Sequence, residues 1–332
     1  MPPNILVTGG AGFIGSAFVR LAVSSGFKVT VADKLTYAGD SARLESVSNR
    51  IVFHNADITD RSKTDAILRK TKPDAIIHFA AETHVDRSIL DSSPFIKTNV
   101  QGTATLIDFA LKYKVKKFLH VSTDEVYGEI KKGYSTESTP LNPCNPYAVS
   151  KAAADMLVQA SVRTFGLPAV IVRPCNNYGP WQYPEKFIPL TILKAMNNQK
   201  TPVFARGLNV REWIYVEDCV EAIMTVLNKG KTGEIYNIGS GEERKNIQII
   251  KTILSVMGKS SDLYTFVKDR PGHDLRYSCN SDKIRKLGWN ERHIFETGLE
   301  KTILWADEHM EWMNGKTKEL RAYWRKVYQR KR

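Results

Sequence analysis

A glycine-rich turn between an apolar strand and an amphipathic helix constrains this chain more than any other feature. A β-branched run over residues 5–8 leads into Thr8-Gly9-Gly10-Ala11-Gly12-Phe13-Ile14-Gly15 and then into an expected helix. Glycines in such a turn let the backbone approach a pyrophosphate, which the positive end of the following helix stabilises. The order of strand, turn and helix predicts a dinucleotide-binding α/β unit.

The alternation of strand and helix continues through the first two-thirds of the 332 residues. We expect strands over residues 5–8, 28–32, 51–54, 75–79, 117–121 and 169–172, and helices over 13–25, 62–70, 99–113 and 147–165. This pattern predicts an α/β fold with a Rossmann-type, doubly wound parallel sheet.

A second, smaller unit is expected after the sixth strand. The chain is rich in Pro, Gly, Asn and Trp over residues 174–213, and helices are expected near 216–228, 246–257 and 295–310. We therefore divide the chain into a dinucleotide-binding Rossmann domain (1–174) and a smaller mixed α/β domain that mainly binds substrate (175–332). Some later segments should return to the first sheet.

Composition narrows the class of protein. The chain has no run of about 18 apolar residues, and its start lacks a basic n-region, so neither a membrane span nor a signal peptide is expected. The four cysteines lie far apart, which argues against a zinc site or a disulfide scaffold. These features favour a cytoplasmic protein without a metal centre.

The net charge of +13 is concentrated at the C-terminal end. Residues 315–332 carry eight basic residues and one acidic residue. Such a tail could bind nucleic acid, but the spacing of Tyr323, Trp324, Val327 and Tyr328 favours a packed helix with a solvated basic face. Nucleic acid is therefore not the expected partner, and the remaining positive charge could attract an anionic small molecule.

Asp33 ends the second expected strand, 18 residues after Gly15. A carboxylate there can bind ribose hydroxyls and would repel a 2′-phosphate, which favours NAD over NADP. Lys34 and Arg43 lie nearby and leave this choice open. Asp57 and Ile58 follow the third strand, and Phe79, Ala80 and Ala81 end the fourth, where open sheets of this kind bind ligands.

The strongest catalytic signal is Tyr147-Ala148-Val149-Ser150-Lys151. A separation of four residues puts Tyr147 and Lys151 on one helical face. A tyrosine that acts as a base near neutral pH needs its pKa lowered by roughly three units, which Lys151 and an oxidised nicotinamide could achieve. Thr123 at the end of the fifth strand adds a hydroxyl for the reacting oxygen.

These motifs resemble the extended short-chain dehydrogenases/reductases. Longer strings narrow the resemblance to the dTDP-glucose 4,6-dehydratase family over nearly the whole chain. They are DKLTYAG (33–39), AAETHVDRS (80–88), STDEVYG (122–128), NNYGP (176–180), PEK (184–186) and DRPGHD (269–274).

The resemblance implies three steps on dTDP-glucose: oxidation at C4, loss of water across C5 and C6, and return of the hydride to C6. Tyr147 would take the 4-hydroxyl proton, Glu125 the C5 proton, and Asp124 would protonate the leaving 6-hydroxyl. Two adjacent carboxyls can fill both roles because each shifts the other's pKa.

The resemblance also assigns binding positions and a homodimer built on the helices at 99–113 and 147–165. The catalytic set is Thr123, Asp124, Glu125, Tyr147 and Lys151. The cofactor set is Gly9, Gly12, Phe13, Ile14, Gly15, Asp33, Lys34, Leu35, Thr36, Asp57, Ile58, Phe79, Ala80, Ala81, Thr83, Thr98, Tyr147, Lys151 and Asn177. The set for the nucleotide sugar is Thr83, Thr123, Asn176, Lys186, Phe187, Pro202, Val203, Phe204, Arg211, Asn246, Arg270 and His273.

Two other functions stay open at this stage. One is a related activity, either a UDP-glucose 4,6-dehydratase or a nucleotide-sugar 4-epimerase. Thymine and uracil differ by one methyl group, worth about 1–3 kcal/mol, whereas an epimerase would not need Asp124 and Glu125. The other is an idle NAD-binding protein whose basic tail holds nucleic acid, which the intact catalytic set disfavours.

Overall fold

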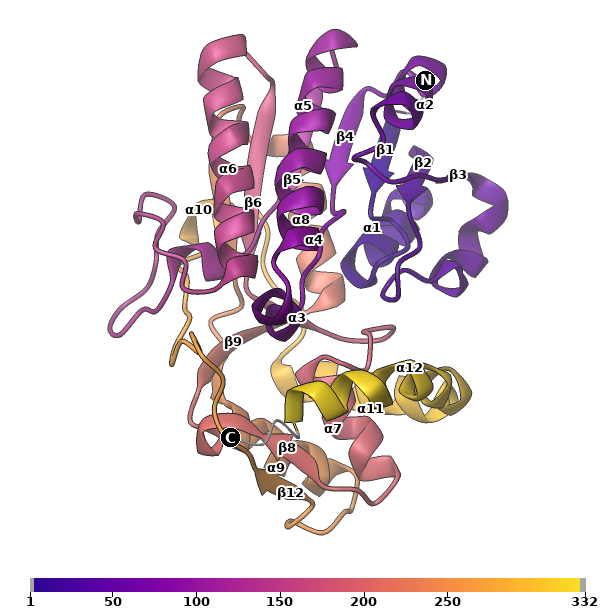
Figure 1. Ribbon diagram of the computed structural model, residues 1–332. Coiled ribbons are helices and arrows are strands. Elements are labelled where there is room, and N and C mark those ends of the chain that lie inside the picture. Colours follow the sequence, from indigo (N-terminus) through magenta and orange to yellow (C-terminus); the bar gives the residue numbers. More distant parts are fainter. Residues whose placement is uncertain (1–2, 329–332) are drawn as a thin grey trace.

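A computed structural model describes residues 3–328 (Figure 1). In this part of the chain the centre is a seven-stranded parallel sheet. Its strands, in spatial order, are β3 (Ile51–Asn55), β2 (Lys28–Asp33), β1 (Asn4–Thr8), β4 (Ala75–His78), β5 (Lys117–Val121), β6 (Ala169–Pro174) and β10 (Ile235–Ile238). This is the Rossmann order, with the direction of winding reversing between β1 and β4. The predicted fold class is confirmed.

Helices cover both faces of the central strands, which are nearly continuous apolar runs, whereas the edge strand β3 is largely exposed. One face packs against α1 (Phe13–Ser24) and α8 (Val216–Lys229). The other packs against α2 (Arg61–Thr71), α5 (Gly102–Lys112) and α6 (Pro146–Phe165), of which α5 and α6 stand in front of the sheet in Figure 1. A π-helical turn, η2 (Ile96–Gln101), directly precedes α5. The helix expected at 99–113 therefore begins earlier than predicted, and its first turns are π-helical rather than α-helical.

The start of α6 is well specified by its sequence. The Asn145 side chain accepts a hydrogen bond from the Ala148 N–H at 2.9 Å, and Pro146 occupies the first helical position. Gly166, with φ of 67°, ends the helix in the left-handed region. Tyr147 therefore lies in the first turn of α6, next to the carboxyl ends of the strands.

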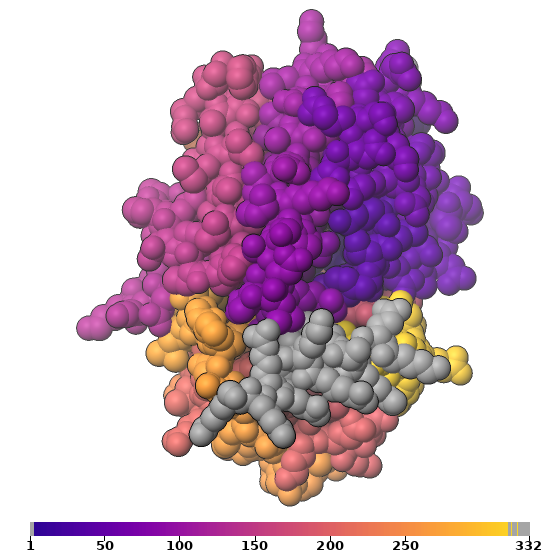
Figure 2. Space-filling view, in the orientation of Figure 1, coloured from indigo at the N-terminus to yellow at the C-terminus, as the bar shows by residue number. Residues whose placement is uncertain are grey.

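A smaller mixed α/β part lies below the sheet (Figures 1 and 2). Its strands are β7 (Asn176–Tyr178), β9 (Val210–Tyr215) and β11 (Glu243–Lys245) in one sheet, and β8 (Thr201–Val203) and β12 (Tyr264–Phe266) in another. Its helices are α7 (Phe187–Met196), α9 (Asn246–Val256), α11 (Phe295–Glu308) and α12 (Met310–Tyr328).

The remaining helical elements of the chain are mostly short and connect the larger ones. They are η1 (Ser41–Arg50), α3 (Val85–Leu90), α4 (Ser93–Phe95), η3 (Asp124–Tyr127), η4 (Phe204–Gly207) and α10 (Asp282–Arg285). The division at residue 174 stays a prediction, although β10 returns to the large sheet beside β6.

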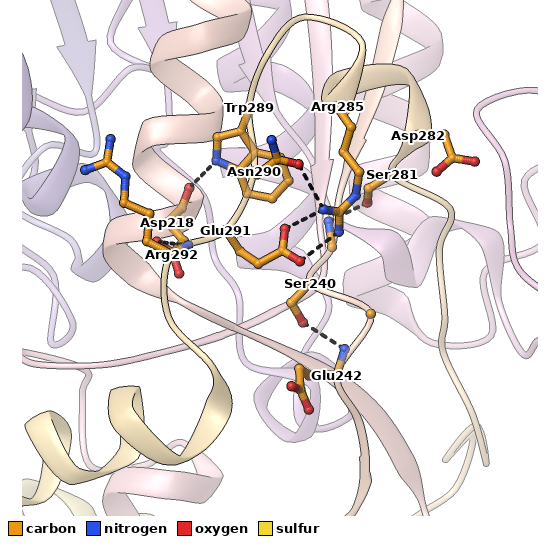
Figure 3. A network of polar contacts seen from close by, with 12 residues as sticks. Asp218, Ser240, Glu242, Ser281, Asp282, Arg285, Trp289, Asn290, Glu291 and Arg292 are labelled. Carbon is orange, nitrogen blue, oxygen red and sulfur yellow. Dashed lines mark hydrogen bonds and ion pairs between the residues drawn. The ribbon is translucent and has the colours of Figure 1, made fainter.

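The segment between α10 and α11 is anchored to α8 (Figure 3). Trp289 donates from Nε1 to the Asp218 carbonyl oxygen at 3.1 Å, and Arg285 forms an ion pair with Glu291 at 2.6 Å. The segment that leads into α11 and α12 is therefore held against α8, one of the helices that cover the large sheet.

The basic C-terminal segment is helical through Tyr328, as predicted. Trp324 packs against the apolar core of the smaller part. Residues 329–332 and the side chains of Tyr323, Val327 and Tyr328 lie outside the described part. None of the helices in the described part is long and apolar enough to span a membrane.

Candidate active site

A cleft opens at the carboxyl ends of the parallel strands, where the winding of the sheet reverses. It encloses about 1520 Å³, including its open mouth, and residues of the segment 175–186 form its other wall. All five residues of the predicted catalytic set line it. So do all members of the predicted cofactor set except Leu35.

The glycine turn forms the floor of this cleft. Gly9 has φ of +72°, and a Cβ there would lie 2.5 Å from the Ala80 backbone nitrogen. A Cβ at Gly15 would overlap the carbonyl oxygen of Gly9. Side chains are thus excluded where a pyrophosphate would need to approach the backbone, and the turn fits a dinucleotide.

Asp33 lies at the end of β2 with its carboxylate held by two backbone donors. Ala11 N–H donates to it at 3.0 Å and Leu35 N–H at 2.8 Å, while burial raises the pKa of Asp33. The two nearby cations are already engaged: Lys34 donates to the Thr98 hydroxyl at 3.1 Å, and Arg43 donates to backbone carbonyls. This arrangement suits ribose hydroxyls better than a 2′-phosphate.

Tyr147 and Lys151 are both buried on the face of α6 that meets β5. Lys151 donates from Nζ to the Val121 carbonyl oxygen at 2.7 Å, and burial lowers its pKa to about 8 against the opposing charge of Asp155. Burial, and after it the charge of Glu125, raise the pKa of Tyr147 despite its hydrogen bond with Thr123. The chain by itself therefore does not make Tyr147 a base, and lowering its pKa requires a further positive charge beside the ring.

Asp124 and Glu125 begin the short helix η3, which Thr123 caps by accepting the Glu125 N–H at 3.3 Å. Burial, and next the charges of Glu125 and Glu212, hold the pKa of Asp124 well above its usual range. Burial also raises the pKa of Glu125, but Arg211, Arg270 and Lys186 oppose that shift. The surroundings therefore favour a protonated Asp124 beside a more readily ionised Glu125.

The predicted nucleotide-sugar residues divide into two groups. Thr83, Thr123, Asn176 and Lys186 line the cleft, and Lys186 donates to the Thr83 carbonyl oxygen at 2.9 Å. The remaining members lie outside the residues that line it and stay predictions. They are Phe187, Pro202, Val203, Phe204, Arg211, Asn246, Arg270 and His273.

Arg211 and Arg270 nevertheless lie close enough to Glu125 to influence its charge. Arg211 donates to the Asp274 carbonyl oxygen at 2.8 Å and stacks over Tyr277 at 4.2 Å. Arg270 pairs with Asp86 at 3.0 Å. These two arginines are thus held in fixed positions on the side of the smaller part.

Several residues that line the cleft were missed from the sequence. Glu185 is one, with Tyr37 donating to it at 2.9 Å and Arg87 pairing with it at 3.0 Å. Its place in the PEK string was the available signal. The others are Ala32, Ala38, Gly39, Arg43, Ala56, Glu82, Val121, Ser122, Pro174, Cys175, Gln182 and Tyr183.

The Rossmann sheet, the glycine turn and the buried Tyr147–Lys151 pair together define a nicotinamide-dependent enzyme of the extended short-chain dehydrogenase/reductase class. Comparison with known proteins makes this more specific. The chain belongs to the family described as GDP-mannose 4,6 dehydratase, whose profile matches residues 6–302.

Individual relatives agree with the family. The chain is 50% identical over 305 residues to the low-salt glycan biosynthesis protein Agl12 of Haloferax volcanii, covering 90% of this chain and 97% of that protein. It is 46% identical over 318 residues to a dTDP-glucose 4,6-dehydratase of Streptomyces niveus, covering 93% and 94%. The crystal structure of DesIV, a dTDP-glucose 4,6-dehydratase from Streptomyces venezuelae with NAD bound, aligns with a TM-score of 0.92 at 46% identity, covering 94% and 99%. The resemblance to dTDP-glucose 4,6-dehydratases is confirmed.

Proposed function

We propose that this protein is an NAD-dependent hydro-lyase that converts dTDP-glucose into dTDP-4-keto-6-deoxyglucose and water. One observation carries the proposal: Asp124 and Glu125 share a cleft with Thr123, Tyr147 and Lys151. An alcohol oxidation alone needs only the tyrosine and the lysine. The two adjacent carboxyls supply the acid and the base of an elimination.

NAD fits the floor of the cleft, where the glycine turn excludes side chains and Asp33 faces the ribose position. Thr98, Thr83 and Asn177 would line its course toward Lys151. When bound, NAD supplies a reversible hydride acceptor and a positive ring next to Tyr147.

The protein's own groups then act in sequence. Tyr147 removes the proton of the sugar 4-hydroxyl, with Lys151 and Thr123 stabilising the phenolate. Glu125 removes the C5 proton, which the new 4-ketone acidifies, and Asp124 protonates the departing 6-hydroxyl. The raised pKa of Asp124 supports its role as the acid.

The test is incubation with dTDP-glucose and a catalytic amount of NAD, followed by detection of the keto sugar by its absorbance in alkali. UDP-glucose serves as the matched substrate that lacks the thymine methyl. Product from dTDP-glucose without net reduction of NAD is expected. Release of a C4 epimer instead of a keto sugar would establish an epimerase.

Glu125→Gln tests the assignment of the base. This variant should bind NAD as the wild type does but lose exchange of solvent hydrogen at C5. Asp124→Asn is its partner, and it should retain C5 exchange while losing the release of water. Normal turnover by Glu125→Gln would refute the role of Glu125.

We also propose a homodimer built on α5 and α6. The exposed face of α6 carries apolar side chains, with Val149 44% and Met156 61% accessible. Surface of this kind is typical of a helix that packs against a partner. Sedimentation of the wild type and of Met156→Asp tests this, since the charge should dissociate the dimer.

A further inference from the structure

Two side chains of α12 reach across to the large-sheet part of the protein and meet at one carboxylate oxygen. Trp312 donates from Nε1 to Oδ2 of Asp40 at 2.9 Å, and the Lys316 ammonium lies 2.8 Å from the same oxygen. Trp312 and Lys316 are four residues apart and so lie on one face of the helix. Figure 2 shows the yellow α12 where the two parts of the molecule meet.

Asp40 is in turn connected to the glycine turn. Its backbone N–H donates to the Ala11 carbonyl oxygen at 3.0 Å, and its Oδ1 accepts the Ala42 N–H at 3.0 Å. Burial alone would raise the pKa of Asp40, but hydrogen bonds from Lys316 and Trp312 outweigh burial and lower that pKa. Asp40 is therefore ionised at neutral pH, and its contact with Lys316 is a true ion pair.

Arg43 makes a second, parallel connection. Its guanidinium donates to the Ala11 carbonyl oxygen at 2.9 Å and to the Trp181 carbonyl oxygen at 3.0 Å. It lies over the Trp312 ring at 5.4 Å, and Trp312 also meets the Trp181 ring edge-on at 5.4 Å. Arg43 is almost fully buried, so these contacts are shielded from water.

These contacts hold the segment of residues 36–43 in place. Thr36, Ala38, Gly39 and Arg43 all line the cleft on the side of Asp33. Trp312 and Lys316 lie beyond residue 302, where the family profile ends its match.

We propose that Trp312 and Lys316 are positioning residues that act through Asp40 to clamp residues 36–43 against the glycine turn and so slow the release of NAD. The inference rests on the proposed function, because NAD that returns to its starting state in every turnover has no need to leave. A cofactor under a fixed wall can escape only when that wall opens. Loosening the wall should therefore change the rate of NAD release more than the chemistry.

The experiment uses the full chain and the variant Trp312→Phe/Lys316→Met, which keeps an aromatic ring at position 312 and a long unbranched side chain at position 316. Each protein is loaded with NAD and diluted, and the free NAD is assayed with time. This variant removes both contacts with Oδ2 of Asp40. We expect release faster by about tenfold, which corresponds to about 1.4 kcal/mol. The KM for NAD should rise while kcat at saturating NAD changes little.

Lys251→Met is the matched control, since Lys251 is exposed on α9, far along the chain from Asp40. It should release NAD at the wild-type rate. Asp40→Asn is a second route to the same loss, because the amide oxygen can still accept the Ala42 N–H while the charge facing Lys316 is gone. Combining Asp40→Asn with Lys316→Met should add little to either change alone.

Release at the wild-type rate from both Trp312→Phe/Lys316→Met and Asp40→Asn would overturn the clamp and leave the proposed function standing. A wild-type protein that holds no NAD would overturn the proposed function and the clamp with it. A lower unfolding temperature with unchanged NAD release would assign Trp312 and Lys316 to stability alone, which also contradicts the proposal.

Discussion

Lys151 donates from Nζ to the carbonyl oxygen of Val121 across 2.7 Å, which joins the first half of α6 to the last residue of β5. The chain leaves β5 directly into Ser122, Thr123 and Asp124. One hydrogen bond therefore fixes the lysine relative to the hydroxyl and the carboxyl with which it shares the cleft. In the proposed mechanism, this contact holds Lys151 close to the carboxyls that would carry out the elimination.

The pKa of Lys151, about 8, predicts a descending limb in the pH profile. The lysine is charged below that pH and loses its proton above it, so its support of a Tyr147 phenolate declines as pH rises. Plots of kcat/KM report the free enzyme and should fall through about pH 8. Steady-state kcat/KM for the sugar nucleotide, measured at saturating NAD across a range of pH values, checks this limb.

Lys151→Arg provides the control, because a guanidinium stays charged over the same range. This variant should be slower, by about 10²-fold or more, since general acid–base groups contribute on that scale. Its residual rate should nevertheless lack the limb near pH 8. A limb that persists unchanged would assign the titration to another group.

Asp124→Asn should stabilise the fold at neutral pH. The pKa of Asp124 is higher in the folded protein than in the unfolded chain. The protonated carboxyl therefore stabilises the fold fully at pH values below the unfolded-state pKa, and this stabilisation is lost as the pH rises through the folded-state pKa. At pH 7 the ionisable side chain therefore costs stability that an amide does not. We expect a gain of about 1 kcal/mol, typical of relieving a destabilised functional group.

Thermal unfolding of Asp124→Asn and the wild type at pH 7 and at pH 3.5 checks this sign. The variant should unfold at a higher temperature than the wild type at pH 7. This difference in unfolding temperature should shrink at pH 3.5, where Asp124 is mostly protonated in both the folded and the unfolded protein. If the variant is less stable than the wild type at pH 7, then burial of Asp124 does not destabilise the fold and the prediction is wrong.

The sequence was informative where function depends on local spacing. Tyr147 and Lys151 could be paired because four residues make about one helical turn, and Asp33 could be placed because an acidic residue ends a strand. The apolar strands around His78 and His120 bury both side chains, and burial lowers the pKa of both.

The sequence did not predict contacts between residues that lie far apart along the chain. Glu185 lies 148 positions from Tyr37, to which it is hydrogen-bonded, and Asp40 lies 272 positions from Trp312. The spacing of residues along the chain does not predict such contacts, because they depend on how the smaller part packs against the large sheet. The basic tail was likewise expected to form a helix, but its contact with Asp40 became visible only in the fold.

Arg173 and Asp155 form a buried ion pair that should matter for stability. Arg173 donates from Nε to Asp155 at 2.8 Å and from Nη1 to the Tyr127 hydroxyl at 2.9 Å, and neither charged side chain is more than 1% accessible. Arg173→Met leaves the Asp155 charge without its main partner and should cost about 3–5 kcal/mol. Urea unfolding measures the loss.

The double variant Arg173→Met/Asp155→Leu separates the value of the pair from the cost of an orphaned charge. Removing both charges should recover most of the stability, since an apolar replacement of a buried pair is often nearly neutral. A double variant no more stable than Arg173→Met would mean that Asp155 stabilises the fold through its other neighbour, His120.

Gly9→Ala and Gly26→Ala form a matched pair that tests the floor of the cleft. Both glycines have positive φ, +72° and +85°, so alanine costs about 1–2 kcal/mol of backbone strain at either position. Only at Gly9 would the new Cβ also collide, 2.5 Å from the Ala80 nitrogen, whereas nothing lies within 4 Å at Gly26. Overpacking adds about 1–3 kcal/mol, so urea unfolding should show the larger loss for Gly9→Ala. Binding of NAD, measured by calorimetry, should fall only in that variant, and an equal fall in Gly26→Ala would mean that backbone strain rather than close approach governs the site.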